Sequence, residues 1–256
     1  MDRLKANFNV PISSWGKNSI NGSVNYLRQH LAFAENPTNA TSLPSADYTR
    51  STIGISAVFS RRDSLFKRPV MYSAGISAFT NELSSIRRIS YTGTIIFPLK
   101  QTANTITNVG VLLIVSPNST IPVLYFGYWH KFTNSPLELN IDLPSNVALR
   151  MPFSSKAWAT VGTAIDPSLT FLTYETPTSS IDLVHNVLDL KTSLSIEHII
   201  GKKMIFGVRG GVINNITSRV QKNTAKMKDY LIDNKSSAVP FVNFSISFLP
   251  FLKSVR

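Results

Sequence analysis

The regular alternation of apolar and polar residues is the feature of this sequence that most limits how the chain can fold. It is clearest between Leu137 and Met151, where apolar residues occupy every second position on both sides of a Pro144-Ser145-Asn146 turn. Successive side chains of a strand point to opposite faces, so this stretch predicts a hairpin with one apolar and one polar face. The same period recurs almost from end to end, and no 3.6-residue period is sustained, which predicts an all-β chain.

The alternating segments predict about 14 strands, with 12 as the alternative count. Tight connections are expected at 144–145, 164–167 and 199–202, and long ones at 176–187 and 214–237. With 14 strands, a further long loop at 35–49 falls at the opposite edge from these two. Either a strand between that loop and the central hairpin is miscounted, which we favour, or the loop is an exception. The expected strands cover 3–10, 24–34, 52–59, 70–78, 88–97, 109–115, 123–131, 137–143, 147–151, 157–161, 169–174, 188–197, 204–212 and 242–248.

Composition indicates where such a sheet would lie. Charged residues make up only 16% of the chain, against about 25% in soluble proteins, and Ser, Thr and Asn take their place. This suits strands with one face in lipid and the other in a wet lumen. No apolar run approaches the ~18 residues of a membrane helix, and no linker divides residues 1–256. We therefore predict one domain: a single closed antiparallel transmembrane β-barrel. The alternative is a soluble all-β binding protein whose apolar face points inward.

The chain also resembles a family of Bacteroidota outer-membrane β-barrels of unassigned function. The resemblance is carried by the segments Leu4–Pro11, Val24–Arg28, Ile121–Tyr125, Leu139–Pro144 with Val147–Arg150, and Val239–Phe248. It spans nearly the whole chain and implies a bacterial outer-membrane location, but it implies no functional residues. Met1–Lys5 already alternates like a strand, so we expect that a signal peptide has been removed or that the native start lies upstream.

The polar faces of the expected strands carry four basic and four acidic residues, so the lumen that they would line is balanced in charge. Buried charges must pair or stay hydrated, which predicts a ladder of ion pairs that braces a narrow barrel. The alternative is a polar conduit or small-ligand site, without strong ion selectivity. These residues are Arg88, Glu138, Asp142, Arg150, Asp189, Lys191, Glu197 and Arg209.

The net charge of +12 is therefore expected to come from connections and tails. Basic outer loops could contact the phosphates of lipopolysaccharide or another anionic partner, whereas the simpler alternative is solvated loop charge. Nucleic-acid binding is not expected, because the polar strand faces are rich in Ser, Thr and Asn and form no continuous basic surface. The basic loop residues are Arg61, Arg62, Lys67, Arg68, Arg219, Lys222, Lys226 and Lys228.

No residue pattern indicates catalysis, a cofactor or a metal site. The four histidines are scattered without metal-ligand spacing, and the absence of cysteine excludes disulfides and thiolate ligands. Aromatic residues gather at 125–132 and 241–251, as in the interfacial girdles of membrane barrels. The sequence thus predicts a non-enzymatic narrow channel, or a structural or surface-binding envelope protein. The alternatives are a lipid-binding or lipid-modifying barrel and a soluble binding protein.

Overall fold

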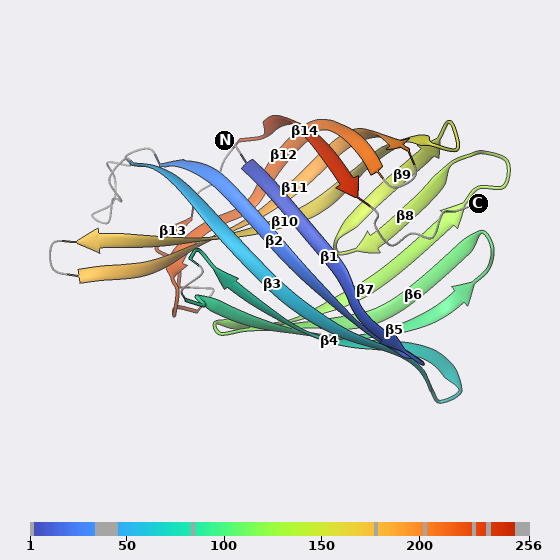
Figure 1. Ribbon diagram of the computed structural model, residues 1–256, viewed down its shortest axis with the longest axis horizontal. Helices are drawn as coiled ribbons and strands as arrows, with labels where there is room; N and C mark the ends of the chain where they lie inside the picture. Colours follow the sequence, from blue (N-terminus) through green and yellow to red (C-terminus); the bar gives the residue numbers. More distant parts are fainter. Residues whose placement is uncertain are drawn as a thin grey trace.

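The chain folds into one antiparallel sheet of 14 strands (Figure 1). The computed structural model describes residues 3–33, 46–82, 85–176, 179–201, 204–226, 229–233 and 237–248, and it contains no helix within them. The strands are β1 (Arg3–Trp15), β2 (Asn18–Phe33), β3 (Ala46–Leu65), β4 (Arg68–Thr80), β5 (Arg88–Gln101), β6 (Thr105–Ser116), β7 (Ser119–Lys131), β8 (Glu138–Leu143), β9 (Asn146–Pro152), β10 (Ala157–Thr176), β11 (Ser179–Ile200), β12 (Met204–Lys222), β13 (Ile232–Asp233) and β14 (Val239–Phe248).

Each strand from β1 to β13 pairs with the next one in sequence, and β14 returns to pair with β12 beside β13. Local turns explain much of this order. Phe66 and Lys67 form the two-residue turn between β3 and β4 with positive φ angles of 51° and 64°, the geometry of a type I′ hairpin turn. Gly16 and Gly201 also have positive φ angles in the turns after β1 and β11, a backbone conformation that glycine adopts without strain.

The predicted turn at 164–167 is wrong, because these residues lie inside the 20-residue strand β10. Asp166 pairs with Asp189 and Pro167 with Leu188 across the β10–β11 ladder. Proline is tolerated here because β9 pairs with β10 only as far as Ala164, so one side of β10 is free of a ladder at this point. The long loop predicted at 176–187 is also wrong, since β10 and β11 form one long hairpin, and the loop predicted at 214–237 begins only after Lys222.

The two strands expected at 157–161 and 169–174 are thus one strand, β10. The miscount therefore lies after the central hairpin and not before it. Apart from the two-residue β13, thirteen strands cross the sheet, and their connections alternate between two edges. We call the first the turn edge; its connections lie at 16–17, 66–67, 102–104, 132–137, 153–156 and 201–203. We call the second the loop edge; it carries both long connections, and its members lie at 34–45, 81–87, 117–118, 144–145, 177–178 and 223–238.

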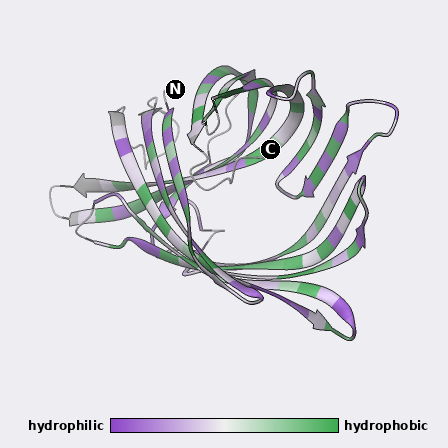
Figure 2. Cartoon of the chain, turned by 45° about the vertical axis from the view of Figure 1, so that its right-hand side comes forward, coloured by the Kyte–Doolittle hydropathy of each residue, from purple (hydrophilic) through white to green (hydrophobic). Residues whose placement is uncertain are grey.

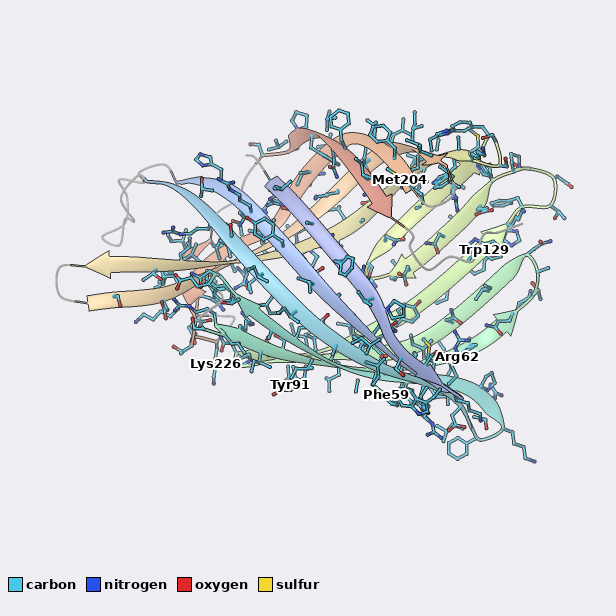
Figure 3. The ribbon with its side chains drawn as sticks, in the orientation of Figure 1. Phe59, Arg62, Tyr91, Trp129, Met204 and Lys226 are labelled. Carbon is cyan, nitrogen blue, oxygen red and sulfur yellow. The ribbon has the colours of Figure 1, made fainter. Side chains whose placement is uncertain are left out.

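The sheet curls (Figure 2). Ion pairs between distant strands show that the polar face is concave, and the strand registers put the apolar residues of opposite phase on the convex face. The curvature is set by contacts between distant strands: Lys5 on β1 bonds Asp166 on β10, and Thr52 on β3 bonds the backbone of Leu169. Residues with the opposite phase project outward; Phe59 and Tyr91 are examples (Figure 3). Among the described residues, 35 large hydrophobic side chains are exposed and only eight hydrophobic residues are buried. The described residues therefore form no second layer over the apolar face of the sheet.

Close approach of neighbouring backbones requires glycine at several positions of the sheet, of which Gly162 and Gly211 are two. A Cβ on Gly162 would lie 2.5 Å from the Val147 carbonyl oxygen, and one on Gly211 would lie 2.1 Å from that of Thr192. Both lie on the concave face, where strands crowd as a sheet curls. A small apolar core of Leu172, Leu183 and Val220 lies near the loop edge, where β10, β11 and β12 extend beyond the other strands.

Hydrogen bonds do not close the curled sheet. Among the described strands, β1 pairs only with β2, and β14 pairs only with β12. The prediction of an antiparallel all-β sheet is confirmed, and closure into a barrel stays a prediction.

Candidate functional site

The concave face is constricted where β1–β3 meet β10–β12, and the centre of this constriction is a cluster of three charges. Lys5 Nζ lies 2.7 Å from both carboxylate oxygens of Asp166, and Lys191 Nζ lies 2.5 Å from Asp166 Oδ2. One carboxylate thus holds two ammonium groups from different strands, and Lys191 also lies 5.8 Å from the centre of the Phe241 ring on β14. The cluster links β1, β10, β11 and β14.

A second ion pair lies one step towards the loop edge. Arg3 Nη1 donates to Asp189 Oδ2 at 2.8 Å, and Asn215 Nδ2 donates to the other oxygen at 3.0 Å. The Asp189 side chain is only 3% exposed, so it needs both donors to replace water. A β-bulge in the β11–β12 ladder lies between Leu188 and Asp189. At the bulge, Ile216 has no opposing residue on β11. This extra residue shifts the pairing so that the Asn215 side chain points to the same face as the Asp189 carboxylate.

Neutral groups complete the constriction. Gln29 on β2 donates to the Thr170 hydroxyl on β10, and both residues are 1% exposed. Thr52 on β3 donates to the Leu169 carbonyl at 3.0 Å. We use the name constriction for the set of side chains of Gln29, Thr52, Thr170, Arg3, Lys5, Asp166, Asp189 and Lys191. Hydrogen-bonded side chains fill it, so the two walls of the curled sheet touch here through polar groups.

The mouth at the loop edge is also crossed by contacts between distant connections. Asn118, between β6 and β7, donates to the Asn223 carbonyl at 2.8 Å, and the Asn223 amide donates to the Arg87 carbonyl at 3.2 Å. Arg87 in turn pairs with Asp182 on β11 at 2.8 Å. These contacts link three connections of the loop edge across the concave space.

The eight charges predicted for the polar faces all lie on the concave face, as their strand registers show. They do not form one ladder. Only Asp189 and Lys191 lie in the constriction, and their ion-pair partners Arg3, Lys5 and Asp166 were not among the predicted residues. Arg3 and Lys5 alternate with Leu4 and Ala6, so their place on the polar face could have been predicted from the sequence. Asp166 was missed because the sequence predicts a turn at 164–167.

The other predicted charges lie elsewhere on the concave face. Glu138 and Arg150 oppose each other on β8 and β9 with 3.9 Å between Oε2 and Nη1, and the Arg150 guanidinium lies 4.2 Å from the Trp158 ring centre. Trp158 Nε1 donates to Glu197 at 2.7 Å. Arg88 donates to the Ser116 hydroxyl near the loop edge, and Arg209 has no carboxylate partner among the described residues.

A shallow pocket of about 210 Å³ lies beside Asp142 in the turn-edge half. Tyr125 and Asp142 line this pocket together, and the Tyr125 hydroxyl lies so close to Gly127 that a Cβ there would be 2.6 Å away. The pocket is lined by Ile106, Asn108, Tyr125, Gly127, Tyr128, Trp129, Asn140, Ile141 and Asp142. The part of the concave face formed by β6, β7 and β8 is therefore rich in aromatic and amide side chains, and we call it the vestibule.

The predicted basic loops are strand ends, and they lie at opposite edges of the sheet. Arg61, Arg62, Lys67 and Arg68 flank the β3–β4 turn at the turn edge, whereas Arg219 and Lys222 belong to β12 and Lys226 follows it at the loop edge. Figure 3 shows Arg62 and Lys226 at opposite ends of the molecule. Lys228 lies outside the described residues. The prediction of basic loops on one side is therefore wrong, because residues 157–176 form one strand and not two, which moves the connection after β12 to the edge opposite the β3–β4 turn.

At each edge, a carboxylate partly compensates the basic cluster. Asp63 accepts bonds from Arg61 at 2.7 Å and from Lys17 at 3.2 Å. The Arg61 guanidinium, together with the Ser64 amide and Lys17, holds the pKa of Asp63 well below its usual range. Arg219 pairs with Asp233 at 3.4 Å and lies over the Tyr230 ring at 4.7 Å.

Across the described part of the chain, no three His, Cys, Asp or Glu residues cluster as a metal site would require. The same residues include no helix long and apolar enough to cross a membrane. Comparison of the chain with protein-family models, with curated proteins and with solved structures found no match.

Proposed function

We propose that this protein is a non-enzymatic β-barrel of a bacterial outer membrane. The observation that carries the proposal is the distribution of side chains on the curled sheet: apolar residues project outward, whereas ion pairs and amides face inward. A soluble protein would bury its apolar face against a second layer, but the large exposed hydrophobic residues outnumber the buried hydrophobic ones 35 to eight among the described residues. In a membrane, lipid would cover this surface, so its apolar side chains would not be exposed to water.

We further propose that the concave space is a narrow polar channel, closed towards the loop edge in the conformation described here. The vestibule is accessible from the turn edge, and the constriction blocks the way beyond it through the bonds of Lys5, Gln29 and Asp166. By analogy with other barrels, the short connections favour a periplasmic turn edge. Arg219, Lys222 and Lys226 would then face outward, where lipopolysaccharide phosphates are candidate ligands.

Single-channel conductance in planar bilayers tests both proposals, with a detergent-free solubility control. We expect insertion with little or no conductance for the unaltered chain, and larger steps for the Lys5→Ser/Gln29→Ser variant, which empties the constriction. Phe8→Leu on the convex face is the matched control and should conduct like the unaltered chain. Equal conductance in all three would assign the constriction a purely structural role. Solubility as a folded monomer without detergent would overturn the membrane proposal.

A further inference from the structure

The pocket of the vestibule is built around Gly127 on β7. Gly127 faces Asn108 on β6 and Asp142 on β8 across the two ladders, so the three residues form one row on the concave face. Tyr125 and Trp129 lie two positions before and after Gly127, and the alternation of a strand directs them to the same face. The position without a side chain is thus bounded by an aromatic residue at each end along β7 and by a polar residue on each side.

The Tyr125 phenol covers Gly127. A Cβ on Gly127 would lie 2.6 Å from the Tyr125 hydroxyl oxygen and 3.2 Å from its Cζ, and Gly127 is buried although it faces the concave space. The phenol therefore lies along β7 on the side of Trp129, which is near the turn-edge end of this strand (Figure 3). A ligand in the pocket would meet aromatic rings at this point and not the polar backbone of β7.

Amide groups supply most of the hydrogen-bonding capacity of the pocket. Asn140 on β8 pairs with Trp129 in the row next to that of Asn108 and Asp142. Neither the Asn108 nor the Asn140 side chain is hydrogen-bonded to another described residue. An amide both donates and accepts, whereas an ionised carboxylate only accepts. Because a hydroxyl group also donates and accepts, this set of groups matches a ligand that carries several hydroxyls.

The charges in and beside the pocket disfavour an ionic ligand. The described lining contains one carboxylate, Asp142, and no lysine or arginine, so an anionic ligand would meet an uncompensated like charge. The row nearest the turn edge on the adjoining strands consists of Lys131, Glu138 and Arg150, with two positive charges against one negative charge. This row repels a cationic ligand that approaches from the turn edge. A neutral ligand meets neither obstacle.

We infer that the vestibule binds one ring of a neutral saccharide. The C–H groups on the face of a sugar ring carry a small positive charge and pack on the negative faces of aromatic rings, here Tyr125 and Trp129. The hydroxyls at the ring edge bond the two amides and the Asp142 carboxylate. The pocket volume of about 210 Å³ is below the ~300–1,000 Å³ of pockets for drug-sized ligands, so it suits about one ring. The inference deepens the proposed channel by naming a ligand class, and it rests on that proposal only for the route by which the sugar arrives.

Trp129 can report binding directly. The chain has three tryptophans, and in the fluorotryptophan-labelled chain the fluorine NMR resonance of Trp129 is identified by its loss in Trp129→Phe. The refolded full chain is titrated in an amine-oxide detergent, because alkyl glycoside detergents carry a sugar headgroup that would compete. The probes are glucose, galactose and mannose, together with the uronate and the protonated amino sugar of each, which carry opposite charges on the same ring.

We expect at least one of the three neutral sugars to shift the Trp129 resonance in a saturable manner. The dissociation constant should be on the order of millimolar, as for a ligand with few heavy atoms. The corresponding uronate should bind at least about tenfold more weakly, because its carboxylate meets that of Asp142. The protonated amino sugar should bind no more tightly than the neutral form, because Lys131 and Arg150 oppose the attraction of Asp142.

Two variants test whether the sugar occupies this pocket. Asn140→Ala removes an exposed amide that bonds no described residue, and the affinity should fall about two- to tenfold. Gly127→Ala displaces the Tyr125 hydroxyl, and the affinity should fall at least about tenfold. The urea midpoint of Gly127→Ala should change little, since only the end of a flexible side chain has to move. Asn7→Ala is the matched control, because Asn7 is an exposed amide on β1 outside the pocket, and this variant should bind like the unaltered chain.

Three results would overturn the inference. The first is the absence of a saturable Trp129 shift with all three neutral sugars in the folded chain. The second is tighter binding of a uronate or an amino sugar than of its neutral form, which would identify a site for an ion. The third is equal affinity in Asn140→Ala, Gly127→Ala and Asn7→Ala, which would place the sugar elsewhere. The titrations need no bilayer and no conductance, so they separate a failure of this inference from a failure of the channel proposal.

Discussion

Lys5 Nζ donates to both carboxylate oxygens of Asp166 at 2.7 Å, although 161 positions separate the two residues in the chain. This contact fastens the first strand of the sheet to the tenth. With Lys191 at 2.5 Å from the same carboxylate, it makes Asp166 the residue on which the curvature of the sheet depends most.

Replacing Asp166 with asparagine should destabilise the fold and loosen the constriction. Lys5 and Lys191 would face each other without a counter-charge, and both ammonium groups lie in a partly buried space. We expect the free energy of unfolding in urea to fall by about 1–3 kcal/mol. The control is Asp182→Asn, whose carboxylate is 49% exposed beside Arg87 and should cost under ~1 kcal/mol. Equal losses in the two variants would contradict a special role for Asp166.

Arginine in place of Leu194 should distinguish lipid from water on the convex face. Leu194 is 54% exposed on β11 and lies level with Val161 and with Leu149 in the short strand β9, so in a soluble protein the charge would change stability little. In a bilayer, an outward arginine at mid-depth costs about 2–4 kcal/mol. We expect that loss in refolding titrations into lipid vesicles, whereas Ile86→Arg, in the β4–β5 connection at the loop edge, should be nearly neutral. A neutral Leu194→Arg variant would argue against burial in lipid.

Valine at Gly162 should prevent proper curling of the sheet. A Cβ at this position would lie 2.8 Å from the Ala148 Cα and 2.5 Å from the Val147 carbonyl oxygen, so backbone would have to move. We expect a loss of about 3 kcal/mol or more in the free energy of unfolding. Gly93→Val is the matched control, because no atom lies within 4 Å of a Cβ built there. The urea midpoint of that variant should stay close to that of the unaltered chain.

The carboxylate of Asp63 should remain ionised at pH values where an ordinary aspartate is already protonated. Bonds from Arg61, the Ser64 amide and Lys17 lower its pKa in the folded state, so the contribution of this carboxylate to stability is present above the unfolded pKa and is lost as the pH falls through the folded pKa. Carbon NMR titration of the side chain should show this directly. Arg61→Gln should return the pKa towards its usual range, and an unchanged titration would assign the effect to the other donors.

The faces of the sheet could be predicted from sequence, because side-chain direction in a strand depends only on odd or even position. Glu138 and Arg150 were therefore placed correctly on one face, and they oppose each other across β8 and β9. The contact between Lys5 and Asp166 could not be predicted, because it depends on how far the sheet curls. Pro167 concealed it further: a proline after Asp166 is typical of a turn, and only the early end of β9 makes room for it inside a strand.

The extents of strands were the second limit. Arg61 and Arg219 follow the apolar parts of β3 and β12, so alternation alone ended those strands too early. Hydrogen bonding to neighbouring strands continues past the apolar segment, so both arginines lie inside strands. They lie at opposite edges because residues 157–176 form one strand where the alternation predicted two.

The brevity of β8 and β9 has a mechanical consequence for any membrane that surrounds this sheet. These strands have six and seven residues, against 20 in β10, so at about 3.3 Å per residue this stretch of wall stands only ~20 Å tall. The hydrocarbon layer of a bilayer is about 30 Å thick. The bilayer beside the β8–β9 hairpin would have to become locally thinner, or lipid headgroups would have to tilt over the end of the hairpin. The wall of the sheet would then be lower on this side than elsewhere, and a hydrophobic molecule could pass there between bilayer and lumen.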